Sequence, residues 1–398
     1  MKKLRHISML IILGVFCLSV ATVMAQDAPK DTTKKKEKHK VSFKDSLDHA
    51  FDLSNYMIYA GGFVLVPVPI TEPALGGIGG ALVPVFLKQR APLIDTVNGK
   101  VRIRRINPDI TGALAMYTAN NSWMAGLFRG GTFAKPNITY RAMAAYGSLN
   151  LSFYHTFPVI GEKEFKFNFK VVPIYLQALK QFGNNNRWSA GIQYLFLDAK
   201  ISSKGDNMPD FVTSKELNSI ISQVGGVFQY DSRDNIFTPN KGVRLQADFF
   251  WSNSILGSDY NSWQIDYSAI GYTPIFKKLI GGLRIEGQQS LGSPPFYTLP
   301  FVNLRGVPSG RYQGKATLQS EVETRWDFYK RWSAVFYGGT GVAYDKWSDM
   351  FANDLVYSYG TGFRYLIARK FGLRMGADVA RGPEKWAYYI VFGSSWLR

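Results

Sequence analysis

The segment Glu164–Val171 reads EFKFNFKV, and its pattern decides the fold class. Successive side chains of a β-strand point to opposite faces. One face of this segment is apolar and carries Phe165, Phe167, Phe169 and Val171. The other face is polar and carries Lys166, Asn168 and Lys170. The period of two therefore predicts a strand with one apolar and one polar face.

The same alternation recurs along the chain. Val243–Ser252 and Phe371–Val379 alternate in the same way, and Trp386, Tyr388, Ile390, Phe392 and Trp396 line one face of the last segment. Sixteen such segments occur between Met57 and Trp396, and they start near Met57, Gly76, Ile110, Asn121, Ile138, Glu164, Asn186, Asn218, Gly242, Asp259, Leu279, Gly314, Trp332, Leu355, Phe371 and Lys385. An even number of strands is typical of a single-chain outer-membrane barrel.

The predicted connections differ between the two ends of the strands. Tight turns fall at 276–278, 328–331 and 368–370, whereas 202–217 and 293–313 are long. Short turns on the periplasmic side and longer loops outside are typical of outer-membrane barrels. The stretch Lys88–Asp109 is an exception, because it would be a long connection on the periplasmic side. Asn98-Gly99 predicts a small hairpin within it.

The two faces differ in chemistry. One face carries aromatic and aliphatic residues, which would meet lipid. The other carries both signs of charge: Arg244, Asp248, Asp266, Arg284, Glu286, Glu321, Glu323, Arg325, Arg364, Arg374 and Asp378. Paired charges suit the wall of a lumen. A large soluble β-sandwich is the alternative, but it gives no reason for Trp and Tyr at strand ends. We therefore predict an all-β, 16-stranded antiparallel transmembrane barrel over residues 56–398.

Residues 1–25 are predicted to be a signal peptide. Lys2, Lys3 and Arg5 precede the apolar run Met9–Val20, which is short for a membrane span. Val23 and Ala25 suit a signal peptidase, so cleavage is expected before Gln26. A transmembrane anchor is the alternative. Cleavage would remove Cys17, the chain's one cysteine.

A basic periplasmic tail is expected over residues 26–55. Phe43, Leu47 and Phe51 are four residues apart, which predicts a short amphipathic helix within Ser42–Asn55. A solvated linker is the alternative. The whole chain has a net charge of +18. Because an exported protein rarely meets nucleic acid, we predict outer-membrane lipids and lipopolysaccharide as partners.

No catalytic or metal-binding set emerges from the sequence. Of four histidines, only His155 lies in the barrel region, where a solvated loop residue is expected. We therefore predict that the protein is not an enzyme and has neither a cofactor nor a metal. The run GGIGG at 76–80 lacks the Lys-Ser/Thr that a phosphate-binding loop needs.

Two stretches resemble the BamA/TamA-type bacterial surface antigen superfamily of outer-membrane barrels. They are YDSRDNIFTPNKG at Tyr230–Gly242 and LRGVPSGRY at Leu304–Tyr312. Three N-terminal stretches, ITEPALGGIGG (70–80), MYTANNSW (116–123) and AYGSLNLSFY (145–154), look like a subgroup with a bare barrel, without POTRA domains. The C-terminal residues resemble an insertion signal, but the usual terminal aromatic is replaced by Arg398.

The resemblance implies an inward-folded sixth extracellular loop whose arginine docks on acidic residues of the barrel wall. The implied docking residues are Arg305, Gly306 and Arg311, with Glu321 and Glu323 as lumen partners. Val307 stands where the family has an aromatic residue. The family's Phe-x-Asp-x-Gly appears as Tyr337, Gly339 and Gly341, without the Asp. The implied periplasmic turn motif comprises Asp231, Arg233, Asp234 and Gly242.

The function that this resemblance implies is that of a protein-insertion or translocation barrel in the outer membrane of a Gram-negative bacterium, with both termini periplasmic. Without POTRA domains, it would work with a separate periplasmic partner protein or on lipids. A weak seam between the first and last strands would be its working part. The alternative is a passive or gated pore, or a barrel that binds lipids or small molecules. The sequence leaves the oligomeric state open.

Overall fold

The computed structural model describes residues 42–396, with gaps at 60–61, 89, 91–92, 98–99, 105–108, 158–160, 184–185, 206–207 and 210–211. The expected signal peptide and the tail up to Lys40 lie outside the described residues. No helix within the described ranges has the length and apolar character needed to cross a membrane.

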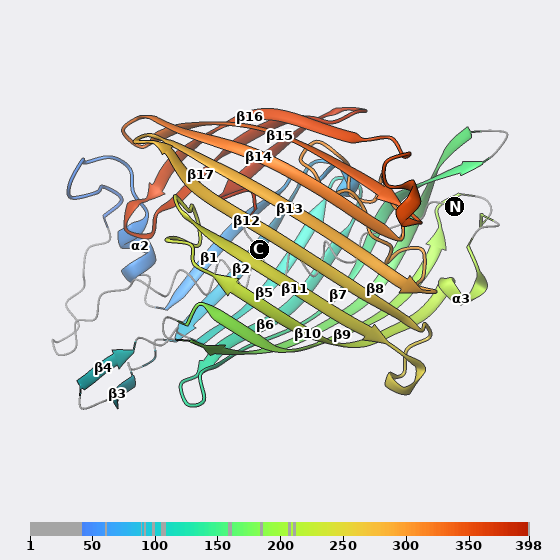
Figure 1. The fold of residues 1–398 in the computed structure, drawn as a ribbon, viewed down its shortest axis with the longest axis horizontal. Coiled ribbons are helices and arrows are strands. Elements are labelled where there is room, and N and C mark those ends of the chain that lie inside the picture. Colours follow the sequence, from blue (N-terminus) through green and yellow to red (C-terminus); the bar gives the residue numbers. More distant parts are fainter. Residues whose placement is uncertain are drawn as a thin grey trace.

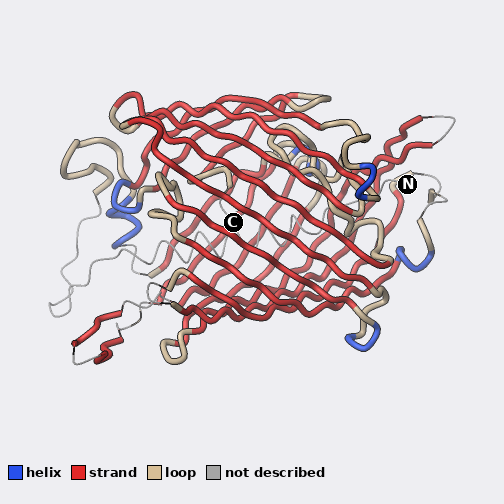
Figure 2. Tube along the Cα trace, in the orientation of Figure 1, coloured by secondary structure: helices blue, strands red, loops and turns tan. Residues whose placement is uncertain are grey.

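Sixteen strands form one antiparallel sheet that curves into a barrel, which confirms the predicted fold class (Figures 1 and 2). The strands are β1 (Phe63–Ile70), β2 (Gly79–Lys88), β5 (Asp109–Thr118), β6 (Trp123–Phe133), β7 (Ile138–Phe157), β8 (Gly161–Phe182), β9 (Trp188–Ser203), β10 (Asn218–Asp231), β11 (Gly242–Ser252), β12 (Ser262–Phe276), β13 (Leu279–Gly292), β14 (Ala316–Tyr329), β15 (Trp332–Tyr344), β16 (Val356–Ala368), β17 (Leu373–Arg381) and β18 (Trp386–Phe392).

The connection between β2 and β5 contains a separate hairpin of β3 (Leu93–Val97) and β4 (Lys100–Arg104). Its two strands flank Asn98-Gly99, so the hairpin predicted within Lys88–Asp109 is confirmed. In Figure 1 it lies at the same end of the barrel as the N-terminal helix α2 (Ser54–Tyr59).

The sheet has one seam. Each barrel strand pairs with its neighbours from β1 round to β18, but no ladder joins β1 to β18 among the described residues. The two outermost strands are also short, with 8 residues in β1 and 7 in β18. The barrel is therefore closed everywhere by backbone hydrogen bonds except along this seam.

Strands β11–β17 follow the expected arrangement of faces. Apolar side chains such as Leu245, Val322 and Phe363 are exposed on the outside. Charged side chains such as Arg364 and Asp378 are buried on the inside. We call this part of the barrel the charged wall.

Strands β7–β9 reverse this arrangement toward their outer ends. Phe167 and Phe169 have exposed fractions of 0% and 1%, and they pack on Phe153 of β7, with ring centroids 5.4 and 5.3 Å apart. Lys166 and Lys170 face outward and are exposed. A lipid-facing position for the apolar side of EFKFNFKV is therefore wrong.

The physical reason is the length of the hairpin. β7 and β8 contain 20 and 22 residues, whereas about 9–11 residues suffice for a strand to cross a bilayer. Figure 1 shows this hairpin, in green, projecting beyond the other strands. Beyond the hydrocarbon core of the bilayer, the outer face meets polar headgroups and water, so the apolar side chains turn inward. We call β7–β9 the extended hairpin region.

The segment before the barrel, residues 42–59, is ordered in a way that neither alternative anticipated. Lys44 and Phe51 form an isolated β-bridge, and the rings of Phe43 and Phe51 stack at 6.2 Å. The helix predicted within Ser42–Asn55 is therefore wrong, because only α2 at its end is helical. The strand expected from Met57 begins at Phe63 instead. We call residues 42–59 the N-terminal strap.

Ion pairs hold the strap against the barrel. Arg331, in the β14–β15 turn, contacts carboxylates of Asp45, Asp48 and Asp52 at 2.5, 2.6 and 2.7 Å. Asp45 also pairs with Arg369 after β16. Hydrogen bonding to Arg369 holds the pKa of Asp45 well below its ordinary value. These contacts explain why the segment is not a solvated linker.

Candidate functional site

The connection between β13 and β14, residues 293–315, enters the lumen and packs on the charged wall. It is the sixth connection at the end of the barrel opposite the strap. Its Val302, Leu304 and Val307 are almost fully buried and cluster with Val356 of β16. Val307 thus fills an apolar site of its own in place of the aromatic residue of the family motif.

Glycines in β15 make room for this loop. A Cβ added at Gly341 would lie 2.7 Å from a methyl group of Val302. One added at Gly339 would lie 3.0 Å from a methyl group of Leu304. The sequence pattern Tyr337, Gly339 and Gly341 therefore fits a strand against which a loop is tightly packed.

Arg305 lies at the centre of a buried ionic cluster. Its guanidinium group contacts carboxylate oxygens of Glu321 at 2.5 Å, Glu323 at 2.8 Å and Asp378 at 3.0 Å. It also lies 3.3 Å from the ring centroid of Tyr337. The first two carboxylates belong to β14 and share a face because they are two residues apart. The structure thus brings Arg305 together with Glu321 and Glu323, as the family resemblance implied.

Asp378 is the partner that sequence reasoning missed. It lies on β17, and it also binds Arg364 through two hydrogen bonds, the longer of which is 2.9 Å. It supplies a carboxylate to Arg305 although the family's Asp is absent from β15. The available signal was its inward position among the charged residues of the predicted lumen face.

The chain after β18 also enters this cluster. Trp396 is 1% exposed, and its Nε1 donates to Glu321 at 2.6 Å. The Ser395 hydroxyl accepts from Arg305 at 3.0 Å. The expected position of Trp396 on the apolar outer face of the last strand is therefore wrong. Gly393, with φ +77°, provides the turn that redirects the chain inward.

The loop touches both sides of the seam. On one side, the Gly306 N–H donates to the Tyr389 hydroxyl of β18 at 2.9 Å. On the other, the Ser309 N–H donates to Glu72 in the β1–β2 connection at 3.2 Å. The loop therefore bridges the two strands that no backbone ladder connects.

Arg311 lies at the rim and not in the central cluster. Its Nε is 3.2 Å from Glu384 in the β17–β18 turn, and its guanidinium group stacks 4.3 Å from the ring of Tyr154 on β7. It therefore links the loop to the last turn and to the extended hairpin region.

The turn between β10 and β11 contains the predicted motif and folds inward at the strap end. Arg233 binds Asp231 at 2.7 Å, and Asp234 accepts from backbone N–H groups of Asn240 and Lys241 at 2.9 and 3.2 Å. Gly242, with φ +106°, ends the turn.

This turn contacts the end of the chain. Phe237 is fully buried with Phe371 and Met57. Its carbonyl oxygen accepts from the Ser394 N–H at 2.6 Å. The turn, the strap and the C-terminal residues thus meet at one end of the lumen.

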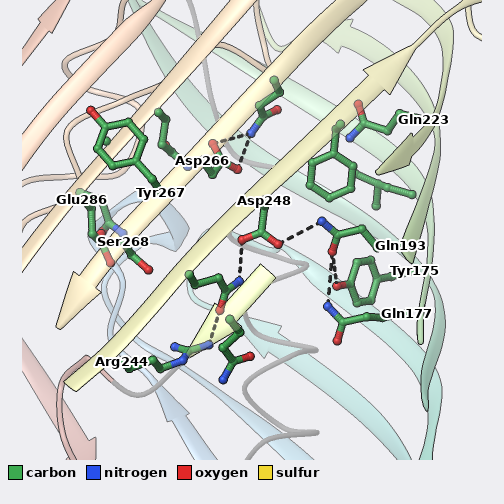
Figure 3. Close-up of a pocket in the computed structure, with 18 of the residues that line it drawn as sticks. Tyr175, Gln177, Gln193, Gln223, Arg244, Asp248, Asp266, Tyr267, Ser268 and Glu286 are labelled. Atoms are coloured by element: carbon green, nitrogen blue, oxygen red, sulfur yellow. Dashed lines mark hydrogen bonds between the residues drawn. The ribbon is translucent and has the colours of Figure 1, made fainter. Parts of the chain in front are cut away.

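A polar cavity of about 220 Å³ lies in the lumen beside the loop (Figure 3). Amide side chains connect its strands: Gln193 of β9 accepts from Tyr175 of β8 at 3.0 Å and donates to Asp248 of β11 at 3.0 Å. Gln246 donates to the same carboxylate at 2.5 Å. Many polar groups of the cavity wall therefore form hydrogen bonds with side chains of neighbouring strands.

Among the described residues, no group of three or more His, Cys, Asp or Glu is arranged to hold a metal. The side chain of His155 lies outside the described part of the chain. The described site consists of a loop arginine bound to wall carboxylates and of a strand edge without a pairing partner.

Comparisons with known proteins agree with this geometry. Residues 131–304 match the Omp85 superfamily domain. No curated protein sequence matches the chain. Among solved structures, the chain is similar to BamA from Haemophilus ducreyi lacking POTRA domains 1-3, with 12% identity, a TM-score of 0.55, and coverage of 83% of this chain and 70% of that one.

It is also similar to CdiB from Escherichia coli, with 9% identity and a TM-score of 0.57, and to CdiB from Acinetobacter baumannii, with 10% identity and a TM-score of 0.55. Each match covers 83% of this chain but 62% and 59% of the respective CdiB chain, so this chain spans less than two thirds of either. At these identities the likeness shows the shared barrel fold. The domain match over residues 131–304 agrees with the superfamily resemblance inferred from the sequence, and the bare-barrel subgroup stays a prediction.

Proposed function

From the premise that this chain carries an Omp85 superfamily domain in an outer-membrane-type barrel, we propose that it inserts or translocates polypeptides, with the β1–β18 seam as its working part. The observation that carries the proposal is the missing ladder between these strands. Unpaired N–H and C=O groups at a strand edge form a template for an incoming strand.

The bridging loop supports the proposal. The contacts Gly306–Tyr389 and Ser309–Glu72 hold the two sides of the seam together without a backbone ladder. Such contacts are individually modest, on the order of 1 kcal/mol each. A seam held by a few side-chain contacts opens at a lower cost than a continuous ladder would.

Recruitment of clients is assigned to a separate periplasmic partner, and both termini to the periplasm, as the sequence suggested. Lipids near the seam are the other class of substrate. We also keep the proposal that the protein is not an enzyme. The pore or binding-barrel alternative is not favoured, because the barrels that this chain resembles include BamA and CdiB, and because a loop fills part of the lumen.

A disulfide lock tests the role of the seam. Cysteine pairs are introduced with one member in Phe63–Ile70 and the other in Trp386–Phe392. Leu283→Cys with Val322→Cys is the control, because these two residues pair in the ladder between β13 and β14 and are outward-facing. Each protein is reconstituted in lipid vesicles with an unfolded barrel client, with and without periplasmic extract.

The expected result is client insertion that requires the extract, stops in the seam-locked forms and returns on reduction. The control pair should insert clients whether oxidised or reduced. Full activity of the locked forms would refute a seam mechanism. Insertion by the chain alone would refute the need for a partner.

A further inference from the structure

The outward face of the extended hairpin region carries two pairs of lysines. Lys170 of β8 lies directly opposite Lys200 of β9. Four residues further out, the Lys204 N–H donates to the Lys166 carbonyl oxygen at 2.9 Å, so these two residues are also opposite each other. We call the pairs lysine rungs. At 3.3 Å per residue they lie about 13 Å apart along the strands.

This arrangement is unfavourable without an anion. Like charges directly opposite on neighbouring strands destabilise a sheet. Within the described part of the chain, none of the four lysines forms an ion pair. Among the side chains that the structure describes on this face, two are acidic, Asp198 and Glu164, and neither is paired with a lysine. The described part of the face therefore carries four cations and two anions, which leaves it positive.

The rungs lie at the edge of the apolar belt. From Lys170 toward the middle of the membrane, the side chains of β8 that face away from the lumen are Val172, Ile174 and Leu176. Two aromatic residues, Trp123 of β6 and Tyr146 of β7, lie at the same height along the barrel as Lys170, and their ring centroids are 5.5 Å apart. Trp and Tyr concentrate at membrane interfaces. The rungs are therefore placed at the depth of lipid headgroups.

The face is also held rigidly. Asn168, between the two rungs, donates to the Ser148 hydroxyl and to the Asn150 side-chain oxygen, each at 2.8 Å. Behind it, the inner face packs Phe167 and Phe169 into an apolar cluster. The strands that carry the lysines are thus fixed before any ligand arrives.

We infer that the lysine rungs bind the phosphate groups of lipid A in the outer leaflet, with one rung at each phosphate. Lipid A carries phosphates at the two ends of a disaccharide headgroup, which suits two cationic pairs separated along a strand. An ordinary phospholipid has a single phosphate and would occupy one rung. This assignment does not depend on the proposed insertion or translocation activity.

Binding is tested with the full-length protein in detergent by native mass spectrometry. The probes are bisphosphorylated lipid A, monophosphoryl lipid A and phosphatidylglycerol. The variant is Lys170→Gln with Lys200→Gln, which removes one rung and keeps the side chains polar. The matched control is Lys180→Gln, an exposed lysine at the other end of β8. Heat-modifiability on gels verifies that each variant is folded.

We expect bisphosphorylated lipid A to bind most tightly. The double variant should weaken its binding about 30-fold, since each lysine near an anionic surface contributes on the order of 1 kcal/mol. Lys180→Gln should leave it unchanged. Unchanged binding in a folded double variant, or equal binding of phosphatidylglycerol and bisphosphorylated lipid A, would overturn the assignment.

Discussion

The extended hairpin region and the charged wall use the same alternation in opposite directions. In β8, phenylalanines point inward and lysines outward; in β14 and β17, carboxylates point inward and apolar side chains outward. The difference lies in what surrounds each strand. Where the hydrocarbon core of the bilayer surrounds the barrel, the outer face is apolar. Where polar headgroups and water surround it, the apolar side chains are buried only on the inside. Period two thus specifies a strand, and the surrounding medium decides which face points inward.

The largest effect is expected on the charged wall. Arg305→Ala would leave Glu321 and Asp378 without their shared cation, and removing one partner of a buried ion pair costs about 3–5 kcal/mol. Urea unfolding and protease sensitivity of the loop would measure the loss. Arg311→Ala, at the partly exposed rim, should cost about 1 kcal/mol or less. Equal effects of the two variants would contradict a central role for Arg305.

The reversed faces of the extended hairpin region give the second test. Phe167→Ala should cost about 3–5 kcal/mol, because it would leave a cavity in a packed apolar cluster. Phe249→Ala, on the lipid-facing side of β11, should cost less, since lipid tails refill the space. Unfolding in urea compares the two. A larger loss for Phe249→Ala would refute the inward position of Phe167.

Restoring the family's aromatic residue gives a smaller effect. Val307→Phe would overfill the cluster of Val302, Leu304 and Val356, and inserting extra volume into a packed core costs about 1–3 kcal/mol. Val307→Ala controls for loss of volume at the same position. A gain in stability with phenylalanine would refute the tight packing of this cluster.

The smallest effect concerns the strap, which rests on turns of the charged wall. Hydrogen bonding to Arg369 lowers the pKa of Asp45, and hydrogen bonding to Arg331 lowers that of Asp48. The resulting stabilisation is fully present above the ordinary carboxyl pKa, about 4, and is lost as the pH falls toward the lowered folded value. A spin label at Leu47→Cys should therefore become mobile only below about pH 4.

Arg331→Ala should make the same label mobile at pH 7. Lys44→Ala, which removes a cation that forms no ion pair among the described residues, is the control and should leave the label immobile. A label that is equally mobile at pH 7 and pH 3 in the parent protein would contradict an ionic attachment of the strap.

The strands and their number could be predicted because alternation is a local property. The predicted starts at Ile138, Asn218, Gly242, Leu279 and Trp332 coincide with those observed. The helical spacing of Phe43, Leu47 and Phe51 predicts the wrong structure for the strap, because ion pairs of Asp45, Asp48 and Asp52 with Arg331, almost 300 residues away, hold this segment. No local pattern encodes such a contact.

The candidate site was predicted in part. Arg305, Glu321 and Glu323 followed from a motif, and Glu321 and Glu323 share one strand face. Asp378 and Trp396 come from later elements, and only the curvature of the sheet and the inward turn after β18 bring them beside the loop. The alternation of β18 does not predict the position of Trp396, because the backbone leaves the strand at Gly393.

The loop that touches Tyr389 on one side of the seam and Glu72 on the other imposes a thermodynamic linkage. Parting of β1 and β18 must break at least one of these contacts. Seam opening and loop release therefore share free energy, and the coupling is reciprocal. An antibody fragment that holds the loop in its docked position would also hold the seam shut. A strand that wedges the seam apart would, by the same amount, loosen the loop for the antibody.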